Sequence, residues 1–256
     1  MYSRKAALGI AILAVLGLSA LAASGATASG ATTFTCVTDP SGTLIGDHCL
    51  TSGTGEKSKH VAIEPNTTTT STLTNANTAE ETKAAKSATL KATLAGVNTE
   101  ITCSEIHGEG TVENRTTGEE MFGHGELKIH FTGCEVKAPA GKGCKVPEGT
   151  ITTNQLTSRT VGSGATGKIS PKEGTTFTEI KLEGCSIAFL NNTFPVTGSL
   201  EAKTNGATIT LTHAEATTQN TLKFGGQKAG IEFAVTTKAH SKAGEETHPL
   251  SYTATP

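Results

Sequence analysis

The sequence predicts an all-β protein whose main body is an antiparallel β-sandwich or a barrel-like domain. Many short segments alternate apolar and polar residues, glycine-containing turns separate them, and threonine makes up roughly a fifth of the chain. Alternation with a period of two is typical of strands that turn one face to a core and the other to water. Several such strands in succession favour a sandwich or a barrel.

Residues 1–28 have the pattern of a signal peptide. Arg4 and Lys5 precede an uncharged apolar run from residue 6 to residue 23, and Ala26-Thr27-Ala28 matches the A-x-A cleavage pattern. We therefore expect an exported protein that begins near Ser29. An uncleaved signal anchor is the alternative, because the run is close to the shortest length that spans a membrane.

Residues 29–64 predict a small cysteine-containing module. A strand is expected over residues 32–37, a turn over residues 39–42 and a second strand over residues 59–64. Cys36 and Cys49 are close in sequence, so a local disulfide between them is the simplest pairing.

Residues 65–86 are low in complexity and predict a linker or a loop, because their threonine run offers almost nothing to a core. One short helix over residues 79–86 is the only regular element expected here, and it is too short to be stable alone.

Residues 87–240 carry the alternation that predicts the β-sandwich-like domain. The alternating segments are residues 89–94, 126–131, 180–183, 208–212 and 231–236. Turns are expected at residues 139–143, 162–164, 205–206 and 225–226. Residues 241–256 are polar and predict a loose tail.

All six cysteines follow the leader, and an even number in an exported chain predicts disulfides. Beyond Cys36–Cys49, the favoured pairing is Cys134–Cys144 with Cys103–Cys185. The rival pairing is Cys103–Cys134 with Cys144–Cys185. Metal binding by these cysteines is disfavoured, because the chain contains no C-x-x-C motif.

Charge and aromatic content limit the classes of partner. The chain has a net charge of -2, and because the leader supplies two positive charges and no negative one, the remainder carries -4. Without a basic stripe, nucleic acid is not an expected partner, and neither is a membrane once the leader is removed. The chain has no tryptophan, so an aromatic platform for sugars is not expected.

The one grouping that resembles a chemical site is His124, Glu126 and His130. On a strand these residues share one face, where they could bind a metal or share a proton. Lys128 lies between them and would oppose a cation, so the alternative is the ordinary solvated face of a sheet. No catalytic or cofactor motif is present, and no cofactor is expected.

The cysteine-containing phrases resemble a family of uncharacterised secreted bacterial proteins that occurs as many paralogues. The phrases are F34-T-C-V37, D47-H-C49, I101-T-C103, F131-T-G-C134, G143-C-K-V146, I151-T-T-N154, G174-T-T-F177, L182-E-G-C185 and L222-K-F-G-G226. This resemblance implies export, disulfides and a β-rich body, and it implies no activity.

The sequence therefore predicts a secreted or cell-envelope protein that acts as a non-enzymatic structural or binding module with an extracellular or envelope partner. A secreted hydrolase or a metal-binding protein, with its site around His124, Glu126 and His130, is the alternative.

Overall fold

A computed structural model describes residues 31–45, 49, 51–75, 88–118, 120–161, 166–205, 208–213, 220–240 and 247–254. The predicted leader and the predicted helix over residues 79–86 lie outside these ranges. The described chain is almost entirely antiparallel β-sheet, which confirms the predicted fold class. Within these ranges, no helix is long and apolar enough to cross a membrane.

The strands, in chain order, are β1 Ala31–Thr38, β2 Leu44–Ile45, β3 Thr51–Ser52, β4 Lys57–Ala62, β5 Thr69–Asn75, β6 Ala88–Leu94, β7 Val97–Thr117, β8 Glu120–Ala138, β9 Ile151–Thr152, β10 Leu156–Thr160, β11 Thr166–Pro171, β12 Thr176–Lys181, β13 Thr193–Thr197, β14 Leu200–Asn205, β15 Thr208–His213, β16 Lys223–Phe224, β17 Gln227–His240 and β18 Thr247–Ala254.

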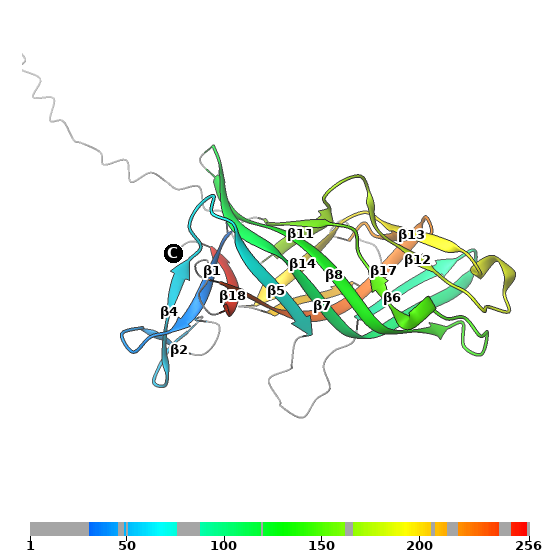
Figure 1. The fold of residues 1–256 in the computed structure, drawn as a ribbon, viewed down its shortest axis with the longest axis horizontal. Coiled ribbons are helices and arrows are strands. Elements are labelled where there is room, and N and C mark those ends of the chain that lie inside the picture. Colours follow the sequence, from blue (N-terminus) through cyan, green and yellow to red (C-terminus); the bar gives the residue numbers. More distant parts are fainter. Residues whose placement is uncertain are drawn as a thin grey trace, which may run out of the picture.

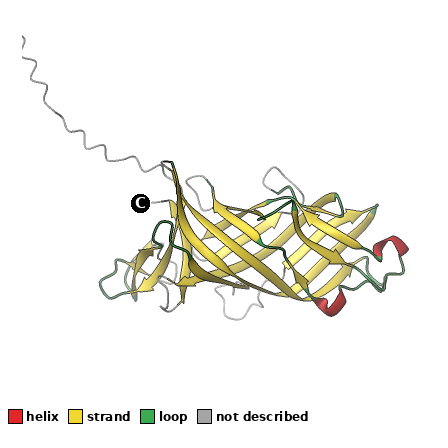
Figure 2. Ribbon diagram, turned by 45° about the horizontal axis from the view of Figure 1, so that its top comes forward, coloured by secondary structure: helices red, strands yellow, loops and turns green. Residues whose placement is uncertain are grey.

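The central sheet closes on itself, as Figures 1 and 2 show. From β8 the hydrogen-bonded order runs through β10, β11, β14, β15 and β17. β17 then pairs with β6 near its start and with β5 near its end, and both of these pair with β7. Pairing of β7 with β8 completes the ring, so the sheet is barrel-like and encloses most of the apolar core.

The β7–β8 hairpin is the longest element, with strands of 21 and 19 residues. Its inner face carries glycines at positions 108, 110, 123 and 125. Beside Gly110, a Cβ atom would lie 2.0 Å from the Glu126 carbonyl oxygen, so only glycine permits this approach. These glycines leave one part of the interior without large side chains.

A second sheet closes one end of the ring. β1 lies between β4 and β18, and β2 pairs with β3 and β4. β18 also pairs with the end of β17, which joins this sheet to the central one (Figure 1). The prediction of a loose tail over residues 241–256 is therefore wrong for residues 247–254, because they complete both sheets.

Asn114 of β7 holds this second sheet in place. Its side-chain oxygen accepts hydrogen bonds from the Thr33 backbone N–H and hydroxyl, each at 2.8 Å. Its amide nitrogen donates to the carbonyl oxygens of Thr33 and Ile63, also at 2.8 Å. Asn114 is 2% exposed, so one buried side chain uses its full hydrogen-bonding capacity to join two segments far apart in sequence.

The other end of the ring is covered by β12, β13 and β16, which pair with one another and with the start of β17. The one-turn 3₁₀ helices Pro147–Gly149 and Ala188–Leu190 lie toward this end (Figure 2). The Cys144–Cys185 disulfide joins the segment that follows β8 to the segment that follows β12.

The disulfides are Cys36–Cys49, Cys103–Cys134 and Cys144–Cys185. The first was predicted, whereas the favoured pairing of the other four cysteines is wrong and the rival pairing is correct. Cys103 and Cys134 lie directly opposite each other on β7 and β8, which places Cys134 beside Cys103 and away from Cys144.

The prediction of a linker over residues 65–86 is wrong for residues 69–75. This segment forms β5, which is hydrogen-bonded on one side to β7 and on the other to β17. Leu73 is buried, and the Thr69 hydroxyl donates to the His240 carbonyl oxygen at 3.0 Å. Pairing along both edges fixes the strand although its composition is polar.

Candidate functional site

His124, Glu126 and His130 all lie on β8, on the face opposite the apolar Leu127, Ile129 and Phe131. His124 Nε2 lies 4.0 Å from Glu126 Oε1, and the other Glu126 oxygen is paired with Lys172 Nζ at 2.7 Å. His130 Nδ1 is bonded instead to the Thr152 hydroxyl at 3.0 Å.

These three residues therefore do not converge on one point. Among the described residues, no group of three or more histidine, cysteine, aspartate or glutamate side chains is arranged to hold a metal ion. Lys172 also lowers the pKa of Glu126 by hydrogen bonding, so this carboxyl group is held in its charged form. An ion-paired carboxylate of low pKa is a poor proton donor for hydrolysis.

His124 is the most buried member of the group, with a side chain that is 12% exposed. Burial is the main cause that lowers its pKa below 6.5, and the charge of Arg115 adds to the effect. Glu113 and Glu126 act in the opposite direction, and Lys172 acts with Arg115. His124 is therefore neutral at pH 7.

We expect the melting temperature to fall as the pH is lowered from 7.5 to 5.5, and to fall less in the His124→Gln variant. Because the pKa of His124 is lower in the folded than in the unfolded state, the unfolded chain binds more protons below about pH 6.5. Thermal melts of both proteins across this range check the prediction. Equal slopes in the two proteins would contradict it.

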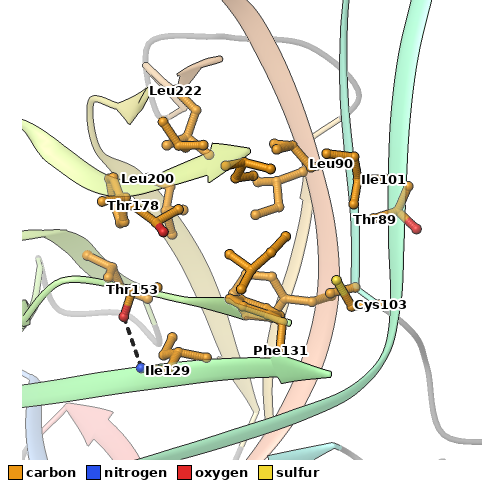
Figure 3. Close-up of a pocket in the computed structure, with 18 of the residues that line it drawn as sticks. Thr89, Leu90, Ile101, Cys103, Ile129, Phe131, Thr153, Thr178, Leu200 and Leu222 are labelled. Atoms are coloured by element: carbon orange, nitrogen blue, oxygen red, sulfur yellow. Dashed lines mark hydrogen bonds between the residues drawn. The ribbon is translucent and has the colours of Figure 1, made fainter. Parts of the chain in front are cut away.

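The interior of the closed sheet contains a first cavity of about 80 Å³ (Figure 3). Side chains of Leu90, Ile101, Phe131, Leu200 and Leu222 surround it. On the same measure one water molecule needs only ~10–15 Å³, so the cavity has room for a small molecule.

The few hydroxyl groups around the first cavity are already hydrogen-bonded. Thr153 accepts the Ile129 backbone N–H at 2.9 Å, and Thr178 donates to the Thr152 carbonyl oxygen at 2.7 Å (Figure 3 shows the first of these bonds). The Thr89 hydroxyl lies 3.4 Å from that of Thr102. The wall therefore presents an apolar surface, and cavities of this kind take apolar occupants in preference to water.

A second cavity of about 70 Å³ lies between the first one and the N-terminal sheet. Its wall combines apolar side chains such as Leu73 and Leu250 with Gly108, Gly123 and Gly125 of β7 and β8. Ile129, Ile169 and Phe233 line both cavities, so these three buried side chains, from β8, β11 and β17, separate them.

Sequence reasoning placed the candidate site on the outer face of β8 and missed the interior. The available signal was the pair of short glycine repeats, Gly108-Glu109-Gly110 and Gly123-His124-Gly125, within strand-like patterns. Glycine inside a strand marks a close approach or a space, and the structure contains both.

Comparison with known proteins adds no assignment to this geometry. No protein-family model matches the chain, and neither a curated protein nor a solved structure matches it.

Proposed function

We propose that the protein is an exported, non-enzymatic binding module that holds a small apolar molecule inside its closed sheet. The observation that carries this proposal is the first cavity, whose wall is apolar and whose hydroxyl groups are already bonded. This ring has the circumference of an eight-stranded barrel, because β5 and β6 share one position between β17 and β7. The interior of such a barrel is either filled by side chains or able to hold one small ligand. The space enclosed here favours the second outcome.

Export to the extracellular space or the cell envelope is part of the same proposal. The leader pattern of residues 1–28 supports it, and three disulfides are typical of proteins that fold in an oxidising compartment. The resemblance to uncharacterised secreted bacterial proteins agrees with export. A binding role is favoured over a hydrolase centred on His124, Glu126 and His130. Glu126 is ion-paired with Lys172, and His130 is hydrogen-bonded to Thr152 instead of contacting the other two residues.

Toluene, used as a small apolar probe, is expected to bind the purified protein and to raise its melting temperature, because a ligand that binds only the folded state stabilises it. The Ala88→Leu variant places a larger side chain at the wall of the first cavity, and we expect toluene to bind it about tenfold more weakly. Isothermal titration measures both affinities.

The matched control is Ala140→Leu, the same substitution at an exposed turn residue. This variant is expected to bind toluene like the original protein. Ala88→Val makes the same test with a smaller side chain, in case leucine disturbs the packing. Absence of toluene binding, or equal affinity in the Ala88 and Ala140 variants, would remove the proposed function.

A further inference from the structure

Thr204 of β14 faces the second cavity and has an unusual hydroxyl group. Among the described residues, only His124 Nε2 and Thr204 Oγ1 are buried side-chain polar atoms without a hydrogen-bond partner. His124 also borders the second cavity, but it belongs to the outer face of β8 and lies among the charged groups of Arg115, Glu113, Glu126 and Lys172. Thr204 is 8% exposed and lines the cavity, so it is a buried polar residue at the cavity wall.

Two other threonines around the second cavity bond to the protein itself. The Thr160 hydroxyl accepts the Gly123 backbone N–H at 2.9 Å, and the Thr237 hydroxyl donates to the Leu250 carbonyl oxygen at 3.3 Å. Leaving a buried hydroxyl unbonded costs about 1–3 kcal/mol, so buried polar groups are normally paired. Thr204 is thus, among the described residues, the lining threonine whose buried hydroxyl has no hydrogen-bond partner.

The charge around the second cavity limits the occupant further. Glu109, His124 and Arg159 border it. Glu109 and Arg159 are exposed, and the Arg159 guanidinium lies over the Phe122 ring at 3.8 Å from its centre, whereas burial lowers the pKa of His124 and keeps it neutral at pH 7. None of these side chains therefore offers an inward-facing charge that could pair with a charged ligand in the cavity. Burying an unpaired charge is very unfavourable. A neutral molecule fits this wall.

We propose that the second cavity is a binding site for a small neutral molecule with one hydroxyl or carbonyl group, which hydrogen-bonds to Thr204 while its apolar body contacts Phe233, Val235 and Leu250. This site is separate from the first cavity, so it goes beyond the proposed function and does not depend on it. Thr204 supplies the polar contact, and the surrounding apolar side chains supply the hydrophobic one.

Phenol and toluene test the proposal because they differ by a hydroxyl in place of a methyl group. Thr204→Val removes the hydroxyl and keeps the shape of the side chain. We expect this variant to bind phenol about three- to tenfold more weakly, the worth of one hydrogen bond, and to bind toluene unchanged. Without ligand, its melting temperature should rise, because a buried unbonded hydroxyl has been removed.

Thr237→Val is the matched control, since Thr237 lines the same cavity but its hydroxyl already bonds to Leu250. Its melting temperature should fall, and its affinity for phenol should stay close to that of the original protein. Unchanged phenol binding in Thr204→Val would overturn the proposal. So would a fall in its melting temperature, which would mean that water already satisfies the hydroxyl.

The two proposals fail in different ways. Loss of toluene binding with a phenol affinity that depends on Thr204 would remove the function assigned to the first cavity and keep the site in the second. Toluene binding that depends on Ala88, together with phenol binding that ignores Thr204, would do the reverse.

Discussion

The Asn114→Leu variant is expected to unfold with a free energy about 4 kcal/mol lower than that of the original protein, and with a melting temperature about 10 °C lower. Leucine has the same number of side-chain heavy atoms and the same branching as asparagine, but it is larger and offers no hydrogen bonds. It would remove the partner of the Thr33 N–H, the Thr33 hydroxyl and the Ile63 carbonyl, and leave the Thr33 carbonyl with only the Ile63 N–H at 3.5 Å. Each such group costs about 1–3 kcal/mol.

Loss of Asn114 also has a local signature. Because this side chain joins β7 to the N-terminal sheet, amide hydrogen exchange in β1 should increase more than exchange in β8. Asn98→Leu is the control, since it makes the same change on the same strand at an exposed position and should alter stability by about 0.5 kcal/mol or less. Equal effects of the two substitutions on the free energy of unfolding would show that the Asn114 hydrogen bonds do not stabilise the fold.

The strands that could be predicted from the sequence are those with regular apolar alternation. In the segments of β6, β8, β15 and β17, apolar residues at every second position identify both the strand and its inner face. Strands β5 and β18 could not be found in this way, because among the side chains whose burial is described each contributes one buried large apolar residue, Leu73 and Leu250 respectively. Their stability comes from pairing with neighbours on both sides, which composition does not reveal.

The disulfide pairing depended on strand register, which short sequence separation does not supply. Cys103 precedes Thr117 by the same number of residues as Cys134 follows Glu120, and Thr117 and Glu120 are the pair that closes the turn between β7 and β8, so the two cysteines face each other. Had this turn been recognised, the symmetry of the hairpin would have selected the correct pairing. The short sequence separation of Cys134 and Cys144 favours a local disulfide, but the register of β7 and β8 overrides it.

The interior sites were beyond sequence reasoning for a related reason. Whether a glycine on the inner face leaves a space depends on what lies across the ring. At Gly123 a Cβ atom would contact the Thr33 methyl group at 2.5 Å, whereas at Gly167 it would meet nothing within 4 Å. The same residue type therefore serves close packing in one place and leaves room in another. The unbonded Thr204 hydroxyl likewise becomes visible only once its neighbours are known.

Replacing both Cys144 and Cys185 with alanine is expected to lower the free energy of unfolding by about 4 kcal/mol and the melting temperature by about 10 °C. This disulfide closes the longest of the three loops, with a sequence separation of 41, and a longer loop loses more freedom in the unfolded chain. Removal of Cys36–Cys49, with a separation of 13, should cost about 3 kcal/mol and serves as the comparison. Calorimetry without reductant measures both.

The same double variant also tests the pairing directly. If Cys144 and Cys185 are bonded to each other, removing both leaves no free thiol, and alkylation without reductant adds no mass. If Cys134–Cys144 and Cys103–Cys185 were the true pairs, two thiols would become reactive.

The Cys144–Cys185 disulfide lies where the backbones of Lys145 and Glu183 exchange hydrogen bonds of 3.0 and 3.1 Å. This point follows strand β12, which carries Ile180 at the first cavity. Toluene binding should therefore weaken in the variant without Cys144–Cys185 and persist in the variant without Cys36–Cys49. This difference would show that the proposed binding role depends on the stability of this end of the ring.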